Sequence, residues 1–574
     1  MKSRWFLIAV ILLAAFLRIY KVDKVPVSLF SDELDAGYQA YSIIKTGRDY
    51  MGNFLPLHFE SYVEWRAPFY IYSAVPSVAL FGLTAIGIRL PAIIFGVLGV
   101  WMMYLFVKEL LIFAGQKNRS EVIAKVSAFI MTINPWHLQY SRAAFEASGL
   151  VFLILCGMYF FFKGLIKPRY IFLSAFFLGL APWDYSTAKL FIPVFVVTLC
   201  VIFFKEIIKL PKTILTKSLI VFLVLGLPLF YVVIFGGGAQ RFNKISVFGD
   251  PARESAISQA IFSDAVFLKE NNGGIFLKLI SKIVNNKISF WGAKILDNYF
   301  TSFSTNFLFL KGDISLRHSV NGIGQFYKFE AVLLLLGVIL FTASKINRKV
   351  KLVILFWILF GVIPSAITIE GGAHATRLIL ILPPLIFLIA YGLTEIFQML
   401  PRFWKPMLLI SYIFLFTASF CFYQYNYWVR YPWTSEKQWH AGFGEAVSDI
   451  KSVEGKYDKV IITNAEELPY IFFAAYYKYD PKLWQKGFQV EYVPGFGELK
   501  HMGKFYFGQV DGQVGFGKLS DLINYKILYV ASQREFAKDL SSDPQSVPKG
   551  FRLVDTINYP SGEPVFYLLE NTET

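Results

Sequence analysis

The chain has 574 residues, of which 55% are hydrophobic, 18% are aromatic and only 17% are charged, and its formal net charge is +16. Ordinary soluble domains carry about 25% charged residues, so this composition excludes a typical soluble enzyme, a disordered chain and a small disulfide-stapled module. The 59 Phe and 32 Tyr residues of this long apolar chain indicate a polytopic membrane protein.

The sequence also lacks the motifs that mark several common kinds of functional site. The three cysteines, Cys156, Cys200 and Cys421, lie inside apolar runs and are typical of buried thiols rather than of a disulfide or metal set. The sequence contains no Walker lysine loop, no GxGxxG and no HExxH. Nucleotide-driven transport therefore has no support in the sequence.

The apolar runs predict the membrane crossings. A helix needs about 20 apolar residues to cross a hydrocarbon core of about 30 Å. The first run follows Lys2 and Arg4 and lacks a small-x-small cleavage site, so we expect an uncleaved signal anchor. In chain order the predicted crossings are residues 5–20, 88–107, 121–134, 146–162, 169–183, 189–204, 217–235, 329–344, 352–368, 376–398 and 406–424.

The excess positive charge sets the predicted topology. It lies almost entirely in short loops at one set of alternate ends of the crossings, for example at Lys345, Arg348, Lys349 and Lys351. Such loops are cytoplasmic by the positive-inside rule, so the N-terminus is expected inside and the C-terminus outside. The charge is then a topology signal, and we expect no nucleic-acid partner.

One further apolar run, residues 68–84, complicates this count. A full crossing there would invert every later loop. We therefore expect a juxtamembrane or half-inserted hairpin, which leaves about eleven crossings.

The outer face collects the long polar segments. Residues 1–425 are expected to form a transmembrane domain with outer loops at about 21–67 and 236–328, and residues 426–574 a separate extracytoplasmic α/β domain. The amphipathic stretches 254–269 and 275–287 of the large loop predict helices on the membrane surface.

The C-terminal domain shows no catalytic constellation and is interpreted as a packing or recognition module. Its apolar runs predict four strands and two helices. The strands are expected at 459–464, 504–510, 526–532 and 565–569, and the helices at about 443–452 and 466–478.

The first outer loop carries an adjacent acidic pair, Asp32 and Glu33, close to the lipid surface. Adjacent carboxylates repel each other, and near a membrane their partial desolvation costs further free energy. An acidic pair at this position therefore indicates a specific structural or catalytic role. One interpretation is a general base that takes a proton from an acceptor hydroxyl. The other is a helix N-terminus, capped by Ser31 and favourable for Asp32, Glu33 and Asp35. The two are compatible.

Four outer turns each carry a cation. A single Arg or Lys at an interface is most often snorkelling, but four beside an acidic loop suit a phosphate or pyrophosphate held by charge-assisted hydrogen bonds. The cations are Arg66, Arg142, Lys189 and Arg377, and their neighbours Glu64, His137, Tyr140, Asp184 and His374 are further candidates for the site.

In chain order the Asp-Glu pair, RAPFYIY with GIRLPAIIFG, PWHLQYSR and HATRLILILPP together resemble the GT-C superfamily of polytopic glycosyltransferases. The chain looks most similar to bacterial phospholipid-carrier-dependent enzymes, which are akin to protein O-mannosyltransferases and to the aminoarabinose transferase that modifies lipid A. The resemblance covers about residues 1–425.

The resemblance implies a sugar donor linked to polyprenyl phosphate, an acceptor hydroxyl on a lipid, glycan or protein, and surrounding membrane lipids as partners. It implies Asp32 as the base, with inversion at the anomeric carbon, in a multi-pass protein of the cell membrane. Arg66 falls where relatives place a Lys or His before a Pro-rich segment, but only Pro68 is present here. Arg142 and Arg377 are further phosphate candidates. Some relatives bind a divalent metal, and metal dependence stays open.

The residues fit this chemistry independently. A phosphodiester-linked sugar departs from a phosphate monoester that needs little acid assistance, so fixed positive charge in a low-dielectric cleft suffices to stabilise it. The competing interpretations are a ligase or polymerase of lipid-linked glycans, a transporter or flippase, and a scaffold with a degenerate core. Charges at the outer turns rather than in mid-span, and the lack of an internal repeat, disfavour transport.

Overall fold

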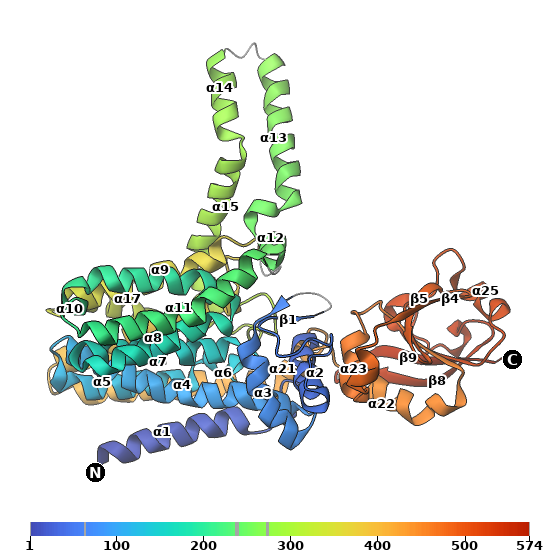
Figure 1. Cartoon of the computed structure of the whole chain (residues 1–574), viewed down its shortest axis with the longest axis horizontal. Coiled ribbons are helices and arrows are strands. Elements are labelled where there is room, and N and C mark those ends of the chain that lie inside the picture. The colour runs from blue at the N-terminus through green and yellow to red at the C-terminus, as the bar shows by residue number, and fades with distance from the viewer. Residues whose placement is uncertain (1, 62–64, 236–239, 271–274, 573–574) are drawn as a thin grey trace. The chain divides into compact units, whose positions relative to one another are not determined.

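The computed structural model describes residues 2–61, 65–235, 240–270 and 275–572 (Figure 1). Two compact units make up the chain. The first comprises Met1–Tyr20, Ser61–Phe69 and Ala92–Gln424, and the second comprises Lys21–Glu60, Tyr70–Pro91 and Tyr425–Thr574.

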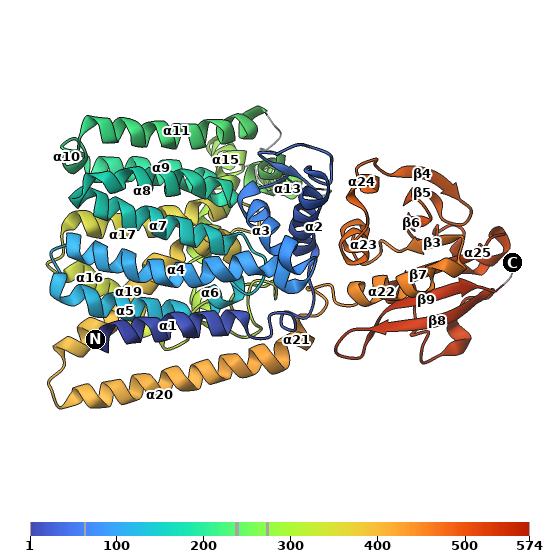
Figure 2. The same ribbon diagram turned by 60° about the horizontal axis from the view of Figure 1, so that its bottom comes forward.

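The first unit is a bundle of apolar helices whose axes run roughly side by side (Figures 1 and 2). Its tightest pairs join α16 with α19, α8 with both α7 and α11, and α9 with α17. The helices are α1 (Lys2–Ile19), α4 (Ala85–Phe113, beginning in the second unit), α5 (Lys117–Ile133), α6 (Pro135–Tyr140), α7 (Ala147–Ile166), α8 (Ile171–Leu180), α9 (Ser186–Ile202), α10 (Phe204–Ile207), α11 (Lys212–Phe235), α16 (Glu330–Ala343), α17 (Arg348–Ala366), α18 (Ala375–Leu378), α19 (Leu382–Met399) and α20 (Trp404–Tyr425).

Six helices of the described chain are long and apolar enough to cross a membrane by length and composition, and three shorter apolar helices accompany them. The count of about eleven crossings stays a prediction. Residues 68–84 contain α3 (Pro68–Phe81), a helix of 14 residues. At 1.5 Å per residue it spans about 21 Å, less than the hydrocarbon core of about 30 Å, and that this segment does not cross the membrane stays a prediction.

The predicted helices of the large loop are confirmed as helices. They are α13 (Pro251–Glu270) and α14 (Ile275–Val284), preceded by α12 (Gln240–Ile245) and followed by α15 (Lys287–Thr301). The two helices α13 and α14 pack side by side and project from the bundle (Figure 1). Their predicted position on the membrane surface is not tested.

The second unit is built on a seven-stranded mixed sheet in the order β4-β5-β6-β3-β7-β9-β8. Its centre is parallel, because β3 pairs with β6 and β7 in the same direction, and the outer pairs are antiparallel. The strands are β3 (Lys459–Ile462), β4 (Gln489–Val493), β5 (Gly497–Met502), β6 (Phe505–Phe507), β7 (Ile527–Ser532), β8 (Phe551–Asn558) and β9 (Pro564–Asn571).

All four predicted strands of this sheet are confirmed as β3, β6, β7 and β9, and both predicted helices as α22 (Phe443–Val453) and α23 (Tyr470–Tyr477). The same unit contains α2 (Ser31–Thr46), which packs against α23 and α24 (Pro481–Trp484). The remaining α-helices and β-strands of the described residues are α21 (Tyr431–Thr434), α25 (Gly515–Leu522), β1 (Phe59–Glu60) and β2 (Trp65–Arg66).

Candidate functional site

The acidic pair lies in the first turn of α2. Phe30 is the N-cap residue in an extended conformation, and no side chain caps the helix. The prediction of Ser31 as the cap is therefore wrong, because Ser31 is already helical. Asp32 and Glu33 follow in the first turn, where the helix dipole favours negative charge.

The two acids have different surroundings. Glu33 is fully buried, and the guanidinium of Arg89 donates to both of its carboxylate oxygens at 2.7 and 2.8 Å. The same guanidinium donates to the carbonyls of Val22, Pro26 and Ser28. Asp32 is only half-buried. Of the pair, Glu33 is thus tied into the core of the second unit, and Asp32 keeps access to solvent.

In the first unit, the segment PWHLQYSRAAFEASG forms α6 and the start of α7. The side chain of Asn134 caps α6 by accepting the backbone N–H of His137. His137 is fully buried, and its Nδ1 lies 2.7 Å from a guanidinium nitrogen of Arg18. Burial and the charge of Arg18 lower the pKa of His137 well below its usual value. His137 is therefore neutral at pH 7 and accepts from Arg18, a structural contact between α1 and α6.

Arg142 also makes structural contacts. Its guanidinium donates to the carbonyls of Leu17 at 2.6 Å and Tyr20 at 2.9 Å. These carbonyls are at the C-terminal end of α1 (Lys2–Ile19), where backbone acceptors lack helical partners and cations are favoured. The contacts favour a helix-capping role over the predicted phosphate role, which nothing here tests.

Arg66 lies close to a carboxylate of the first unit. Its guanidinium is buried and lies 3.9 Å from a carboxylate oxygen of Glu146. Glu146 in turn raises the pKa of Asp184 electrostatically. Arg66 and Asp184, two of the predicted residues, are thus each linked to Glu146, and Glu64 lies outside the described residues.

Asp184 is a fully buried carboxyl group between α8 and α9. Its oxygens lie where a side chain on Gly149 would begin, 2.8 and 2.9 Å from the ideal Cβ position. Burial first and the nearby charge of Glu146 second raise its pKa well above the usual value, and they outweigh the backbone N–H of Leu150. A glycine at 149 is what leaves room for this carboxyl.

The raised pKa predicts a pH-dependent stability. Below about pH 3.9 Asp184 is protonated in both the folded and the unfolded chain. As the pH rises above that value the unfolded chain releases the proton more readily, so the folded state loses stability until the folded pKa is passed. Asp184→Asn should remove this loss. We expect the variant to have a higher Tm than the wild type at pH 8 and a similar Tm at pH 4, and a lower Tm at pH 8 would contradict the assignment.

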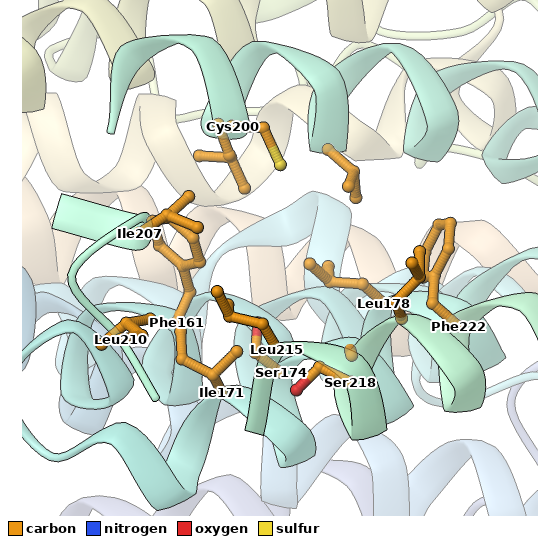
Figure 3. A pocket seen from close by; sticks show the side chains of 14 residues that line it. Phe161, Ile171, Ser174, Leu178, Cys200, Ile207, Leu210, Leu215, Ser218 and Phe222 are labelled. Carbon is orange, nitrogen blue, oxygen red and sulfur yellow. The ribbon is translucent and has the colours of Figure 1, made fainter. Parts of the chain in front are cut away.

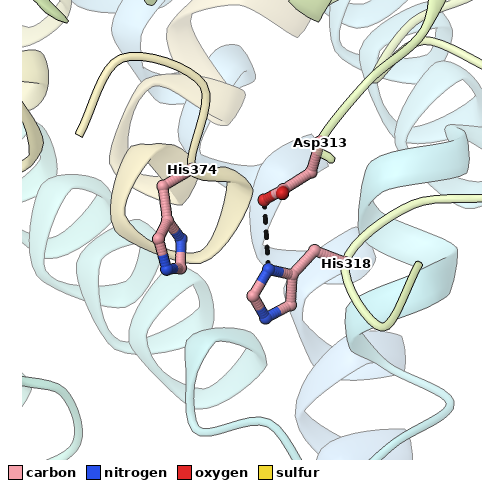
Figure 4. A group of neighbouring side chains, drawn as sticks. All are labelled: Asp313, His318 and His374. Carbon is pink, nitrogen blue, oxygen red and sulfur yellow. Dashed lines mark hydrogen bonds and ion pairs between the residues drawn. The ribbon is translucent and has the colours of Figure 1, made fainter. Parts of the chain in front are cut away.

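A second cluster contains Tyr140 and His374. The Tyr140 hydroxyl lies 2.6 Å from that of Thr376, and its ring stacks on the imidazole of His318. The rings of His318 and His374 are 4.9 Å apart. Asp313 completes the cluster through an oxygen 3.0 Å from His318 Nδ1 (Figure 4).

Asp313, His318 and His374 could hold a metal ion, since one ligand atom from each lies within 4.8 Å of the others. Burial raises the pKa of Asp313, but the hydrogen bond and charge of His318 and the charge of His374 lower it more, so the net pKa is below the usual value. Asp313 is therefore a carboxylate at neutral pH.

The two remaining predicted cations lie at helix starts. Arg377 is half-buried in α18 and donates to the Thr368 hydroxyl at 2.7 Å. Lys189 is half-buried in the first turn of α9. Sequence reasoning missed Arg89, Asp313 and His318. Arg89 lies inside an apolar run, and Asp313 and His318 meet His374 only through the fold.

An apolar cavity of about 190 Å³ lies among helices α7 to α11 (Figure 3). The hydroxyls of Ser174 and Ser218 donate to backbone carbonyls within this region. Because the rest of the lining is apolar apart from the thiol of Cys200, the cavity suits hydrocarbon rather than a reaction. The lining residues are Phe161, Ile171, Ser174, Ala175, Leu178, Val196, Leu199, Cys200, Ile207, Leu210, Leu215, Ser218, Leu219 and Phe222.

Comparison with known proteins gives likenesses of fold. No protein-family model and no curated protein sequence matches the chain. The fold is similar to that of ArnT from Cupriavidus metallidurans bound to undecaprenyl phosphate, with a TM-score of 0.50 and 12% identity over 99% of this chain and 98% of ArnT.

The oligosaccharyltransferase of Archaeoglobus fulgidus is similar as well. Its apo form gives a TM-score of 0.50 and 12% identity over 92% of this chain and 69% of that one. The form tethered to an acceptor peptide containing the NVT sequon gives the same score and identity over 98% and 74%. The chain therefore shares the fold of ArnT and of this oligosaccharyltransferase.

Proposed function

We propose that this chain is a membrane glycosyltransferase that moves one sugar from a polyprenyl-phosphate carrier to a hydroxyl group on the extracytoplasmic face. The observation that carries the proposal is the likeness of fold to ArnT with bound undecaprenyl phosphate, because it extends over nearly the whole of both chains. The long apolar helices support it, since a polyprenyl carrier is itself confined to the membrane.

Asp32 is the general base in this proposal. The acceptor oxygen attacks the anomeric carbon while its proton passes to the Asp32 carboxylate. The bond from that carbon to the carrier phosphate breaks on the opposite side, and the phosphate monoester leaves with the bonding electrons. The sugar is thereby inverted. Solvent access of Asp32, in contrast to the buried Glu33, supports this choice between the two acids.

Glu33 is a positioning residue in this account. Its bidentate contact with Arg89 ties the first turn of α2 to the loop carbonyls of Val22, Pro26 and Ser28. Preorganisation of the catalytic group lowers the cost of reaching the transition state. The same contact therefore also holds the backbone of Asp32, the preceding residue, in place.

Arg66 serves the donor phosphate. Its buried guanidinium faces Glu146 at 3.9 Å, longer than the 2.7–2.9 Å typical of a charge-assisted hydrogen bond. As a buried and permanently charged group, it can donate charge-assisted hydrogen bonds to a phosphate oxygen of the carrier. Negative charge develops on the departing phosphate monoester. A fixed positive charge at that position stabilises the transition state of this reaction.

Arg66→Ala is expected to reduce transfer about 10²-fold, the usual loss when one fixed charge-stabilising donor is removed. The measurement is the rate of donor consumption over a range of donor concentrations. The matched control is Arg169→Ala. Arg169 is exposed, and its observed contacts are with the hydroxyl and the ring of the neighbouring Tyr170. Equal rates for the two variants would remove Arg66 from the donor site.

The likeness to the oligosaccharyltransferase favours a second candidate, transfer of an assembled oligosaccharide onto a peptide. The two functions differ in the length of the sugar that the carrier holds. Purified full-length protein in nanodiscs would be given polyprenyl-phosphate monosaccharides in parallel with lipid-linked oligosaccharides. Consumption of a monosaccharide donor supports the proposal, and consumption of oligosaccharide donors alone supports the second candidate.

A further inference from the structure

Three side chains of the first unit that are distant in sequence converge on one point. Asp313 and His318 belong to the end of the large loop, just after the π-helical segment Asn306–Leu310, and His374 directly precedes α18. One carboxylate oxygen and one nitrogen from each imidazole lie within 4.8 Å of one another (Figure 4). Only the fold brings these stretches together.

The distances are close to those of a coordination sphere. Zn²⁺ holds nitrogen and oxygen ligands at about 2.0–2.2 Å in a tetrahedron, which places two ligands roughly 3.4 Å apart. The Asp313 oxygen and His318 Nδ1 are 3.0 Å apart. The third ligand atom, on His374, lies within 4.8 Å of both of them.

The ligands are held by outer contacts of the kind that orient metal-binding groups. One oxygen of Asp313 accepts the backbone N–H of Ser315, and the other accepts that of Ala375 at 2.7 Å. The imidazole of His318 packs against the rings of Tyr140 and Phe145. The side chains of Asp313 and His318 are only 8% and 13% exposed, so they lose little freedom on binding an ion.

We propose that Asp313, His318 and His374 bind one divalent transition-metal ion, with Zn²⁺ as the expected ion, and that this ion fastens the end of the large loop to the turn before α18. Two imidazoles and one carboxylate suit Zn²⁺ better than Ca²⁺ or Mg²⁺, which prefer oxygen ligands. Three protein ligands leave a fourth position for water. The site is independent of the proposed glycosyl transfer, so it can stand if that proposal fails.

The test is direct metal binding to full-length protein purified without a histidine tag. The protein is stripped with a chelator, loaded with Zn²⁺, desalted and analysed for metal per chain, and Co²⁺ is used in parallel because its visible spectrum reports nitrogen and oxygen ligands. We expect one ion per chain and a rise in Tm on loading. Affinity should fall at least tenfold in both His318→Ala and His374→Ala.

Two further variants keep the result interpretable. His501→Ala is the matched control, because His501 lies in strand β5 of the sheet and should leave the stoichiometry at one. Asp313→Asn preserves the size of the side chain and guards against loss of fold, and it should weaken binding while leaving the metal-free Tm close to that of the wild type. Wild-type protein that retains no ion, or His318→Ala and His374→Ala variants that bind one ion with unchanged affinity, would overturn the proposal.

Discussion

Replacing Asp32 with asparagine is expected to slow sugar transfer by about 10²–10⁴-fold and to leave the protein folded. Asparagine has the size of aspartate but cannot take a proton from the acceptor hydroxyl. General-base catalysis contributes about 10²–10⁴-fold to a rate, and a loss in that range is expected in the rate of product formation at saturating donor. The side chain is half-buried, so the Tm should change little.

The control for this variant is Asp23→Asn, which removes a charge from an exposed aspartate of the same unit. It should keep the wild-type rate. A rate for Asp32→Asn within a few-fold of the wild type would exclude Asp32 as the base. Loss of activity together with a large fall in Tm would show instead that Asp32 supports the fold.

The largest effect on stability is expected for Arg89→Ala. The change leaves the carboxylate of Glu33 buried without its ion-pair partner and removes the donor to three backbone carbonyls. Removing one member of a buried pair costs about 3–5 kcal/mol. Chemical unfolding of the second unit, followed by a fluorescent probe in the sheet, should show a loss of this size in the free energy of unfolding.

The matched control is Arg552→Ala. Arg552 pairs with Glu570 on the surface, with its side chain 69% exposed, and exposed pairs contribute about 0–1 kcal/mol. The double variant Glu33→Gln with Arg89→Met removes the charge of both partners and should recover part of the loss. If Arg89→Ala were no more destabilising than Arg552→Ala, the buried pair would not anchor α2.

The parts of the fold that could be predicted are those with a one-dimensional signal. Strands β3 and β7 are short apolar runs because the centre of a mixed sheet is buried on both faces, and both were predicted. Strands β4, β5 and β8 were missed. Many of their residues are exposed or half-buried, and they include Glu, Lys, Asp and Arg. Such sequences resemble loops when the paired strand is unknown.

In the candidate site too, residues that are adjacent in sequence could be predicted, and contacts between distant residues could not. The acidic pair of α2 could be found because its two members are adjacent. The partner of Glu33 could not, because Arg89 is 56 positions away and resembles an interfacial arginine that snorkels. The predicted phosphate cations were assigned from their positions at outer turns alone. The structural contacts of Arg142 and His137 depend on Leu17, Tyr20 and Arg18, which only the packed helices bring near.

The measurement that tests the central claim most directly is identification of the lipid product. Purified protein in nanodiscs would be incubated with an acceptor extract and a panel of polyprenyl-phosphate monosaccharides, and the lipids analysed by mass spectrometry. The proposed function predicts that one donor is converted to free polyprenyl phosphate with its sugar found on an acceptor hydroxyl. Folded wild-type protein that leaves every such donor intact, or that releases only polyprenyl pyrophosphate from lipid-linked oligosaccharides, would contradict it.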